Sequence, residues 1–206
     1  MPPESANPTY HSDPSKTIVV VSGLPRSGTS MMMTMLEAGG ISPLTDQLRA
    51  ADVDNPKGYY EFERVKQLPK GDTAWLPDAQ GKAVKVIAAL LPHLPPEYTY
   101  RVIFMRRAMR EILASQRQML IRRGEDPDKI SDDTIARLFE KHVQQVDRWI
   151  SQRPNVVRLD VNYNETLKDP HPAITRIDHF LGGGLDVMKM ARTVDASLHR
   201  QRTSGG

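Results

Sequence analysis

Residues 23–30, Gly-Leu-Pro-Arg-Ser-Gly-Thr-Ser, carry the most specific chemical signal in the sequence. Gly23 and Gly28 have the G-x-x-x-x-G spacing of phosphate-binding loops, in which backbone N–H groups converge on an anion. In nucleoside triphosphatases such a loop continues with Lys-Ser/Thr, whereas this sequence continues with Thr29 and Ser30. The missing lysine is the residue that reaches the terminal phosphates of a triphosphate. Its loss argues against ATP or GTP as the substrate that reacts.

Arg26 lies inside the loop and supplies the positive charge that the missing lysine does not. A guanidinium group is planar and can grip a phosphate or a sulfonate with two N–H groups at once. The alternative is a tight strand-to-helix turn whose glycines serve only geometry. Because several hydrogen-bond donors also gather at this predicted helix start, we favour anion binding. The predicted anion-binding residues are Arg26, Ser27, Gly28, Thr29 and Ser30.

Two strong elements flank this loop. Residues 17–22 (TIVVVS) form a β-branched apolar run that is typical of a strand buried on both faces, and residues 29–38 are a helical stretch that ends at two glycines. Further strands are expected at residues 83–88, 100–105 and 156–161, and further helices at residues 61–68, 109–122, 132–151 and 172–181. Strands that alternate with helices predict an α/β fold, a three-layer parallel β-sheet flanked by helices.

Two of the predicted helices have residues at helical spacing that we expect to face the interior. In the helix at 109–122 these residues are Met109, Ile112, Leu113, Gln116, Met119 and Leu120. In the helix at 132–151 they are Ile135, Leu138, Phe139, His142, Val143, Val146, Trp149 and Ile150.

The composition is that of a globular protein, with 39% hydrophobic and 26% charged residues in a chain of 206. This length is enough for one compact domain. A net charge of +3 is too small to indicate a nucleic-acid-binding surface by itself. The absence of cysteine excludes disulfides, thiol catalysis and thiolate metal sites, and it fits a reducing compartment.

The sequence shows no targeting signal. Residues 1–16 are rich in Pro, Ser and Asn and lack the apolar centre of a signal peptide. No apolar run approaches the roughly 18 residues that a membrane-spanning helix needs. We therefore expect a cytoplasmic protein without a membrane anchor, with flexible segments at residues 1–16 and 203–206 around a single domain at residues 17–202.

Four segments together resemble the family of sulfotransferases that use 3′-phosphoadenosine 5′-phosphosulfate (PAPS). The loop at 23–30 resembles the family's 5′-phosphosulfate loop, which also has Thr where triphosphatases have Lys. Residues 107–115 resemble its 3′-phosphate site, an Arg at a strand end with a Ser eight residues later. Residues 156–170 resemble its strand followed by Tyr-Glu-x-Leu and Asp-Pro, and residues 174–182 resemble its closing helix ending in Phe-Leu-Gly.

The order and spacing of these segments agree with the family over nearly the whole chain. The resemblance implies a sulfotransferase fold like that of P-loop NTPases. It also implies transfer of a sulfonate from PAPS to an acceptor, with adenosine 3′,5′-bisphosphate (PAP) as the product and no metal. It does not reveal the acceptor, which we expect to be a small molecule, a glycan or a peptide with a hydroxyl or amine group.

The resemblance assigns the 3′-phosphate to Arg107 and Ser115, with Arg106 as a rival, and it places Tyr163 near the adenine. Each residue also has an ordinary structural explanation. Arg107 could be a solvated charge at a helix start, Ser115 a helix-surface serine, and Tyr163 a core residue.

The sequence departs from the family pattern at two of these positions. The family usually has Asp-Pro or Asn-Pro after the arginine, whereas Ala108 and Met109 follow here. In the later motif, Asn164 intervenes between Tyr163 and Glu165.

The catalytic residues that we predict are Arg26, Lys85 and Glu61. Arg26 is expected to neutralise charge on the transferring group, and in the family a Lys at the position of Lys85 contacts the sulfonate or the bridging oxygen. Many cytosolic members have a catalytic His two residues after that Lys, where this chain has Ile87. Residues 55–61 (NPKGYYE), which begin with a predicted turn at 55–58, resemble a segment found in bacterial members, and other branches of the family use a glutamate as the base. The resemblance makes Glu61 the first choice for the general base, with His93 a distant second. The alternatives are a snorkelling lysine and a solvated carboxylate.

Two other functions explain part of the same pattern. A P-loop kinase of small molecules would use the same strand, loop and helix, with Asp160 as a magnesium ligand, but Thr29 stands where its lysine belongs. A non-catalytic nucleotide-binding protein would retain the loop without an acceptor site. The histidines form no metal-binding pattern, so no metal site is expected. C-terminal basic segments fold back on the nucleotide in the family, which implies this role for a set of basic residues, and the alternative is a solvated tail. These residues are Arg192, His199, Arg200 and Arg202.

Overall fold

The framework of the protein is one parallel sheet. The computed structural model describes residues 16–46 and 60–194. Within them the strands are β1 (Thr17–Gly23), β2 (Ala83–Lys85), β3 (Thr99–Arg106) and β4 (Val156–Asn162), in the order β2-β1-β3-β4. All three pairings are parallel. Every residue of β1 is buried, which confirms the prediction of a strand covered on both faces.

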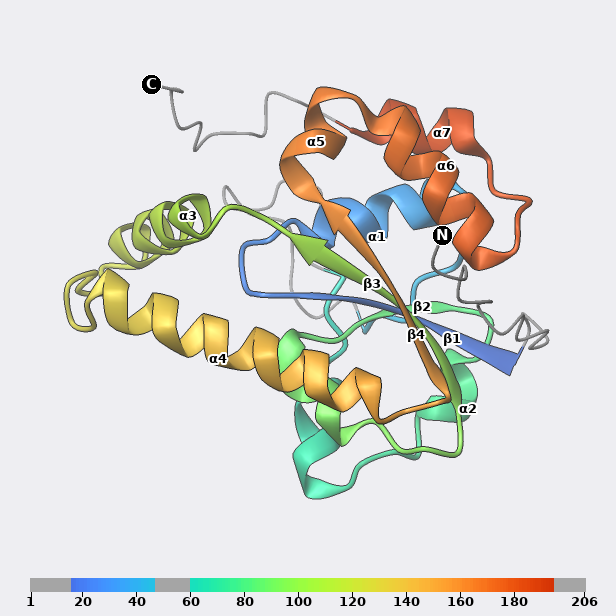
Figure 1. Ribbon diagram of the computed structural model, residues 1–206, viewed down its shortest axis with the longest axis horizontal. Coiled ribbons are helices and arrows are strands. Elements are labelled where there is room, and N and C mark those ends of the chain that lie inside the picture. Colours follow the sequence, from blue (N-terminus) through green and yellow to red (C-terminus); the bar gives the residue numbers. More distant parts are fainter. Residues whose placement is uncertain (1–15, 47–59, 195–206) are drawn as a thin grey trace, which may run out of the picture.

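Helices cover both faces of the sheet and complete three layers (Figure 1). One face carries α1 (Thr29–Ala38), α5 (Tyr163–Lys168), α6 (Pro170–Leu181) and α7 (Val187–Thr193). The other carries α2 (Leu76–Ala79), α4 (Asp132–Ser151) and the 3₁₀ helices η2 (Glu63–Lys70) and η3 (Ala88–His93). The helix α3 (Met109–Arg122) follows β3 and packs beside α4. The predicted three-layer α/β fold with a parallel sheet is confirmed.

The alternation of side chains along the strands divides the core between the two faces. Val20 and Phe104 point into the layer that contains α4, whereas Val21 and Ile103 point into the layer that contains α1. A smaller cluster joins Leu24 of the loop to α3 and α4. The loop after β1 is therefore anchored in apolar packing at its base.

Several boundaries differ from the sequence prediction. The second strand ends at Lys85 and not at residue 88, because the chain turns into η3 at Ala88. The helix expected at 61–68 is a 3₁₀ helix at 63–70. The structure adds α2, α5 and α7, none of which the sequence analysis predicted.

The apolar stripes of the two long helices are partly wrong. Leu138 of α4 is 49% exposed, although we expected it to face the interior. In α3 the buried residues are Glu111, Ile112 and Ser115, and two of these are polar. The inner face of α3 is therefore rotated from the predicted stripe, because its first turns lie against the loop after β1, where Arg26 donates a hydrogen bond to Ser115.

Some predictions fall on residues outside the described ranges. They are the prediction of flexibility at residues 1–15 and 203–206, the predicted turn at 55–58, and the role of the basic residues His199, Arg200 and Arg202. Among residues 16–46 and 60–194, no helix combines the length and the apolar character that crossing a bilayer requires.

Replacing Ile103 by Ala should destabilise the protein strongly, because this central-strand side chain is fully buried. We expect a loss of about 2–5 kcal/mol in the free energy of unfolding, measured by urea denaturation. The matched control is Ile121→Ala, since Ile121 is 49% exposed on α3, and its loss should be about 0.5 kcal/mol or less. Equal losses at the two sites would contradict the assigned core.

Candidate active site

The predicted site residues lie at the carboxyl ends of the four parallel strands. The glycine loop follows β1, Lys85 is the last residue of β2, Arg107 comes directly after β3, and Tyr163 comes directly after β4. Because the strands run parallel, their carboxyl ends meet at one edge of the sheet. That edge is where open α/β sheets bind their ligands.

The loop between β1 and α1 needs its glycines for close packing. A Cβ atom on Gly23, whose φ is 152°, would lie 2.4 Å from Ser27 Oγ. A Cβ atom on Gly28, whose φ is 97°, would lie 2.2 Å from Cδ2 of Tyr163. Arg26 has a left-handed φ of 67°, which is unfavourable for a residue with a side chain. The loop is therefore a tight and strained turn.

The start of α1 has the properties of an anion site. Gly28 is the N-cap and contributes no side-chain hydrogen bond, and the first turn contains no acidic residue. Ser27 is fully buried, and its hydroxyl has no hydrogen-bond partner within the described ranges. The N–H groups of a helix start carry partial positive charge, so these features together suit a phosphate or sulfonate.

Arg26, Arg107 and Ser115 lie in direct contact although they are far apart in the sequence. Arg26 donates from Nε to Ser115 Oγ at 2.9 Å, and Arg107 donates from Nη1 to the carbonyl oxygen of Arg26 at 2.9 Å. Ser115 is 8% exposed and so is not a surface serine. The loop and the first turns of α3 thus form one unit.

Arg107 is a buried residue and not a solvated helix-start charge. Its Nε donates to Glu111 Oε2 at 2.9 Å, and the side chain is 7% exposed. Its guanidinium carbon lies 4.6 Å from the ring centroid of Tyr163. Tyr163 is itself 7% exposed, and burial raises the pKa of its hydroxyl, which the charge of Arg107 partly opposes.

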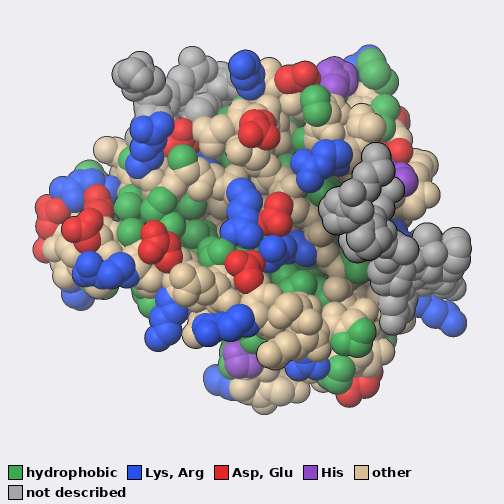
Figure 2. Space-filling view, viewed as in Figure 1, with side chains coloured by type: hydrophobic (Ala, Val, Ile, Leu, Met, Phe, Trp, Pro, Cys, Tyr) green, Lys and Arg blue, Asp and Glu red, His purple; other side chains and the backbone are tan. Residues whose placement is uncertain are grey.

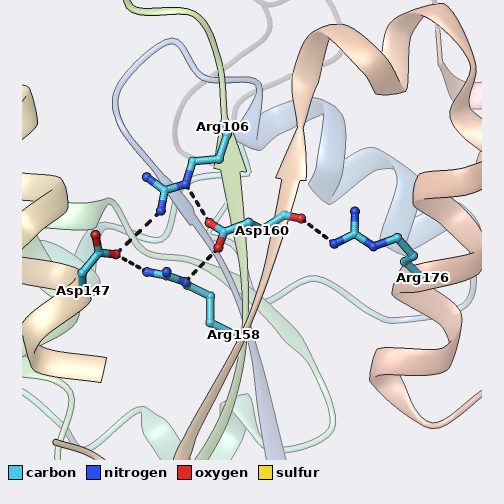
Figure 3. Close-up of polar contacts among 5 residues, drawn as sticks. All are labelled: Arg106, Asp147, Arg158, Asp160 and Arg176. Carbon is cyan, nitrogen blue, oxygen red and sulfur yellow. Dashed lines mark hydrogen bonds and ion pairs between the residues drawn. The ribbon is translucent and has the colours of Figure 1, made fainter. Parts of the chain in front are cut away.

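Arg106, the sequence rival of Arg107, makes its contacts with other elements (Figure 3). Its Nε donates to Asp160 Oδ1 of β4 at 2.7 Å, and its Nη2 lies 3.7 Å from Asp147 Oδ1 of α4. Its guanidinium also stacks over Phe104, at 4.6 Å. Arg106, the last residue of β3, is thus directed to β4 and α4, whereas Arg107, the next residue, reaches the loop.

The ion pairs around Asp160 form a network on the surface of β4. Arg158 contacts both Asp147 and Asp160, and Arg176 of α6 donates to the carbonyl oxygen of Asp160 at 3.1 Å. Figure 2 shows basic and acidic side chains interleaved at the centre of this face. The carboxylate of Asp160 is thus engaged by two guanidinium groups, which does not suit a magnesium ligand.

Lys85 and Glu61 lie together beside α1. Lys85 Nζ donates to Ser30 Oγ at 3.3 Å and lies 4.0 Å from Glu61 Oε1. The side chains of Lys85 and Glu61 are 11% and 22% exposed. The carbonyl oxygen of Glu61 accepts from the Thr45 hydroxyl at 2.8 Å and from the N–H of Asp46 at 3.3 Å. The Glu61 backbone is therefore fixed next to the lysine and the helix start.

Two other predicted candidates lie elsewhere. His93 is exposed at the end of η3, in a segment that leads to the amino end of β3 and so to the opposite edge of the sheet. Arg192 is exposed in the last turn of α7. In the part of the chain that the structure describes, no group of three or more acidic or histidine side chains is placed to hold a metal ion.

Sequence reasoning missed two polar residues of this site, the buried Glu111 and the partly buried Asn164. Glu111 is 3% exposed and receives hydrogen bonds from Arg107 and, at 2.8 Å, from Asn164 Nδ2. The available signal for Glu111 was its position four residues after Arg107, a spacing that lets a residue just before a helix pair with one in the first turn. The available signal for Asn164 was its position between Tyr163 and Glu165, where it interrupts the Tyr-Glu-x-Leu pattern of the family.

The comparisons with known proteins agree on one kind of domain. A family model described as the sulfotransferase domain matches residues 16–201. No curated protein matches the chain.

The solved structures that are similar to this chain include the following three. The mouse sulfotransferase SULT7A1 complexed with PAP is 20% identical, with a TM-score of 0.57 over 95% of this chain and 70% of that one. The sulfotransferase domain of the Synechococcus PCC 7002 olefin synthase is 18% identical, with a TM-score of 0.53 over 95% and 91% of the two chains. The sulfotransferase domain from the curacin biosynthetic pathway is 15% identical, with a TM-score of 0.53 over 92% and 93%.

Replacing Gly28 by Ala should cost more stability than the same change at Gly40. Both glycines have a left-handed φ, 97° and 105°, so both variants pay for backbone strain. Only Gly28 faces the Tyr163 ring, whereas the structure shows nothing from the described residues within 4 Å of a Cβ on Gly40. We expect Gly28→Ala to lose about 1–3 kcal/mol more in urea unfolding. Equal losses would mean that the tyrosine does not pack on the loop.

Proposed function

Because the chain belongs to the sulfotransferase domain family, we propose that it transfers a sulfonate group from PAPS to a hydroxyl or amine group of an acceptor. The observation that carries the proposal is the contact between the glycine loop, Arg107 and Ser115 at the carboxyl edge of the sheet. The similar mouse enzyme is complexed with PAP, the product that such a donor leaves. We propose that residues 17–202 act as one domain.

The residues of the loop suit the 5′ end of the donor. The loop contains the buried hydroxyl of Ser27, and α1 begins directly after Gly28, so helix-start N–H groups from Thr29 and Ser30 are available to an anion. Without the lysine of triphosphatases, this site has fewer charges for a chain of three phosphates. A phosphosulfate, with two anionic groups, matches it better.

The residues from α3 suit the 3′-phosphate of the same donor. Arg107 and Ser115 both contact Arg26, so a phosphate bound by this pair would also lie within reach of the loop arginine. Charge-assisted hydrogen bonds from guanidinium groups to phosphate are stronger than neutral ones. Tyr163 packs against both Gly28 and Arg107, and we propose that it borders the nucleotide on the adenine side.

The transfer itself needs a base and a cation near the sulfur. The acceptor oxygen or nitrogen forms a bond to sulfur, while the bond from sulfur to the bridging oxygen breaks and its electron pair stays on the 5′-phosphate of PAP. Glu61 takes the acceptor proton, and Lys85 neutralises the charge that develops on the bridging oxygen. The two side chains lie 4.0 Å apart, which allows both to act on one reacting centre.

The contacts of Asp160 weigh against the kinase alternative, since two arginines engage its carboxylate. The non-catalytic alternative shares the nucleotide site with the proposal and differs from it only in transferring no group to an acceptor.

Because the sequence lacks cysteine, the chain suits a reducing compartment, and we propose that it acts in the cytoplasm.

PAP should stabilise the protein against heat without magnesium. A ligand that binds only the folded state at 100 times its Kd adds about 2.7 kcal/mol of stability, which is readily measured as a rise in Tm. The control is ATP, with and without magnesium, which should give a smaller shift. A shift that requires both ATP and magnesium would favour the kinase, and no shift with PAP would overturn the proposed donor.

Replacing Glu61 by Gln should lower kcat by about 10²–10⁴-fold and leave PAP affinity unchanged, because only the proton acceptor is lost. The measurement is PAP released from PAPS with a panel of phenol, sugar and amine acceptors. Glu63→Gln is the matched control, since that carboxylate pairs with Lys66 on the surface. If both variants keep the wild-type kcat, Glu61 is not the base. If the wild type binds PAP but turns over with no acceptor, the non-catalytic alternative is favoured.

A further inference from the structure

The site contains a buried carboxylate that the proposed reaction does not use. Glu111 lies in the first turn of α3 and is 3% exposed. A buried carboxylate is costly unless charged or polar groups compensate it. Its partners should therefore indicate why it is there.

Both oxygens of Glu111 are engaged by residues of the proposed nucleotide site. Oε2 accepts from Arg107 Nε at 2.9 Å, and Oε1 accepts from Asn164 Nδ2 at 2.8 Å. The side chains of Arg107 and Glu111 are 7% and 4% exposed, so this ion pair is shielded from water. Asn164 belongs to α5, which means that the carboxylate ties α3 to the element after β4.

These contacts fix the guanidinium of Arg107 on three sides. Glu111 holds Nε, the carbonyl oxygen of Arg26 accepts from Nη1, and the ring of Tyr163 lies 4.6 Å from the guanidinium carbon. The third nitrogen of the planar group, Nη2, takes part in neither hydrogen bond. A planar guanidinium held at Nε and Nη1 has one orientation, and Nη2 is then aimed in one direction.

One of the partners, Asn164, is itself a departure from the family pattern. The chain has Ala108 and Met109 where the family usually has Asp-Pro or Asn-Pro, and Asn164 interrupts the later motif. Here Glu111, two residues after Met109 on α3, accepts hydrogen bonds from both Arg107 and the intervening Asn164. The asparagine that departs from the family pattern is thus part of the hydrogen-bond cluster around Arg107.

We propose that Glu111 and Asn164 are positioning residues that orient Arg107 for the 3′-phosphate of the donor, an inference that rests on the proposed function. Long side chains lose rotamer freedom when they bind a ligand, and a side chain that is already held loses less. Glu111 fixes the arginine, and Asn164 fixes the carboxylate. Neither residue needs to touch the nucleotide.

The charge of Glu111 has an effect on phosphate binding that opposes the orienting effect. A carboxylate beside Arg107 also cancels part of its charge and so weakens its attraction for a phosphate. The burial of the pair favours orientation as the larger effect, because a guanidinium that loses its buried partner is left uncompensated and must turn toward water or lose its contacts. Removing the carboxylate should therefore weaken phosphate binding.

The test compares the affinities for PAP and for adenosine 5′-monophosphate, which lacks only the 3′-phosphate, by isothermal titration calorimetry. Glu111→Gln should lower the affinity for PAP about tenfold and change that for the monophosphate less than about twofold. In an Arg107→Ala background the same change should lower the ratio of the two affinities no further, because the residue being oriented is gone.

Asn164→Ala separates orientation from charge, because it leaves the carboxylate of Glu111 in place. Its PAP affinity should fall about threefold, with the monophosphate unaffected. This milder variant also keeps the proposal testable if Glu111→Gln does not fold. Asp160→Asn is the matched control, since it removes a carboxylate from the neighbouring Arg106 and should leave both affinities unchanged.

Three results would overturn the inference. Tighter PAP binding by Glu111→Gln would mean that the carboxylate reduces the charge of the site. An equal loss for both ligands would mean a general structural role. Failure of the wild-type protein to bind PAP would overturn the proposed function itself, and this result is distinguished from the first two because it appears before any substitution.

Discussion

All four strands run in the same direction, and this constraint determines where the functional side chains can lie. Each parallel strand delivers the residue that follows it to the same edge, so the loop, Lys85, Arg107 and Tyr163 converge although they are spread over most of the chain. One antiparallel strand would move its residue to the opposite edge. The parallel pairing of the strands is therefore the first requirement of the site, and the identity of its side chains is the second.

The two adjacent arginines at the end of β3 both form ion pairs, but the two pairs differ in burial and therefore in their effect on the structure. Arg106 pairs with Asp160 where both side chains are more than a third exposed, and such pairs contribute little stability because water screens them. Arg107 pairs with Glu111 in nearly complete burial, where loss of either partner is expensive. An exposed pair tolerates change, whereas the buried pair fixes a geometry.

Local pattern predicted the parts of the molecule that local interactions determine. The buried run at 17–22, the glycine loop and the helix after it follow from apolar continuity and from backbone requirements. The burial of Glu111 and Ser115 did not follow, because apolar periodicity assigns polar residues to the outside. The position of Lys85 beside Glu61 did not follow either. The two residues are far apart in the sequence, and residue spacing does not show how distant segments pack together. Polar contacts between distant segments depend on the tertiary structure, which local sequence patterns do not determine.

The strained backbone of the loop at Arg26 is held in place by the same residues that we assign to the 3′-phosphate. A left-handed residue with a side chain costs about 1–3 kcal/mol, and it persists only where neighbouring groups hold it. At Arg26 the neighbours are Arg107, which donates to its carbonyl oxygen, and Ser115, which accepts from its side chain. The groups that we assign to the 3′-phosphate therefore also stabilise the loop that we assign to the 5′ end. A change at either end of the nucleotide site should reach the other through Arg107, because this one guanidinium contacts both the loop and α3.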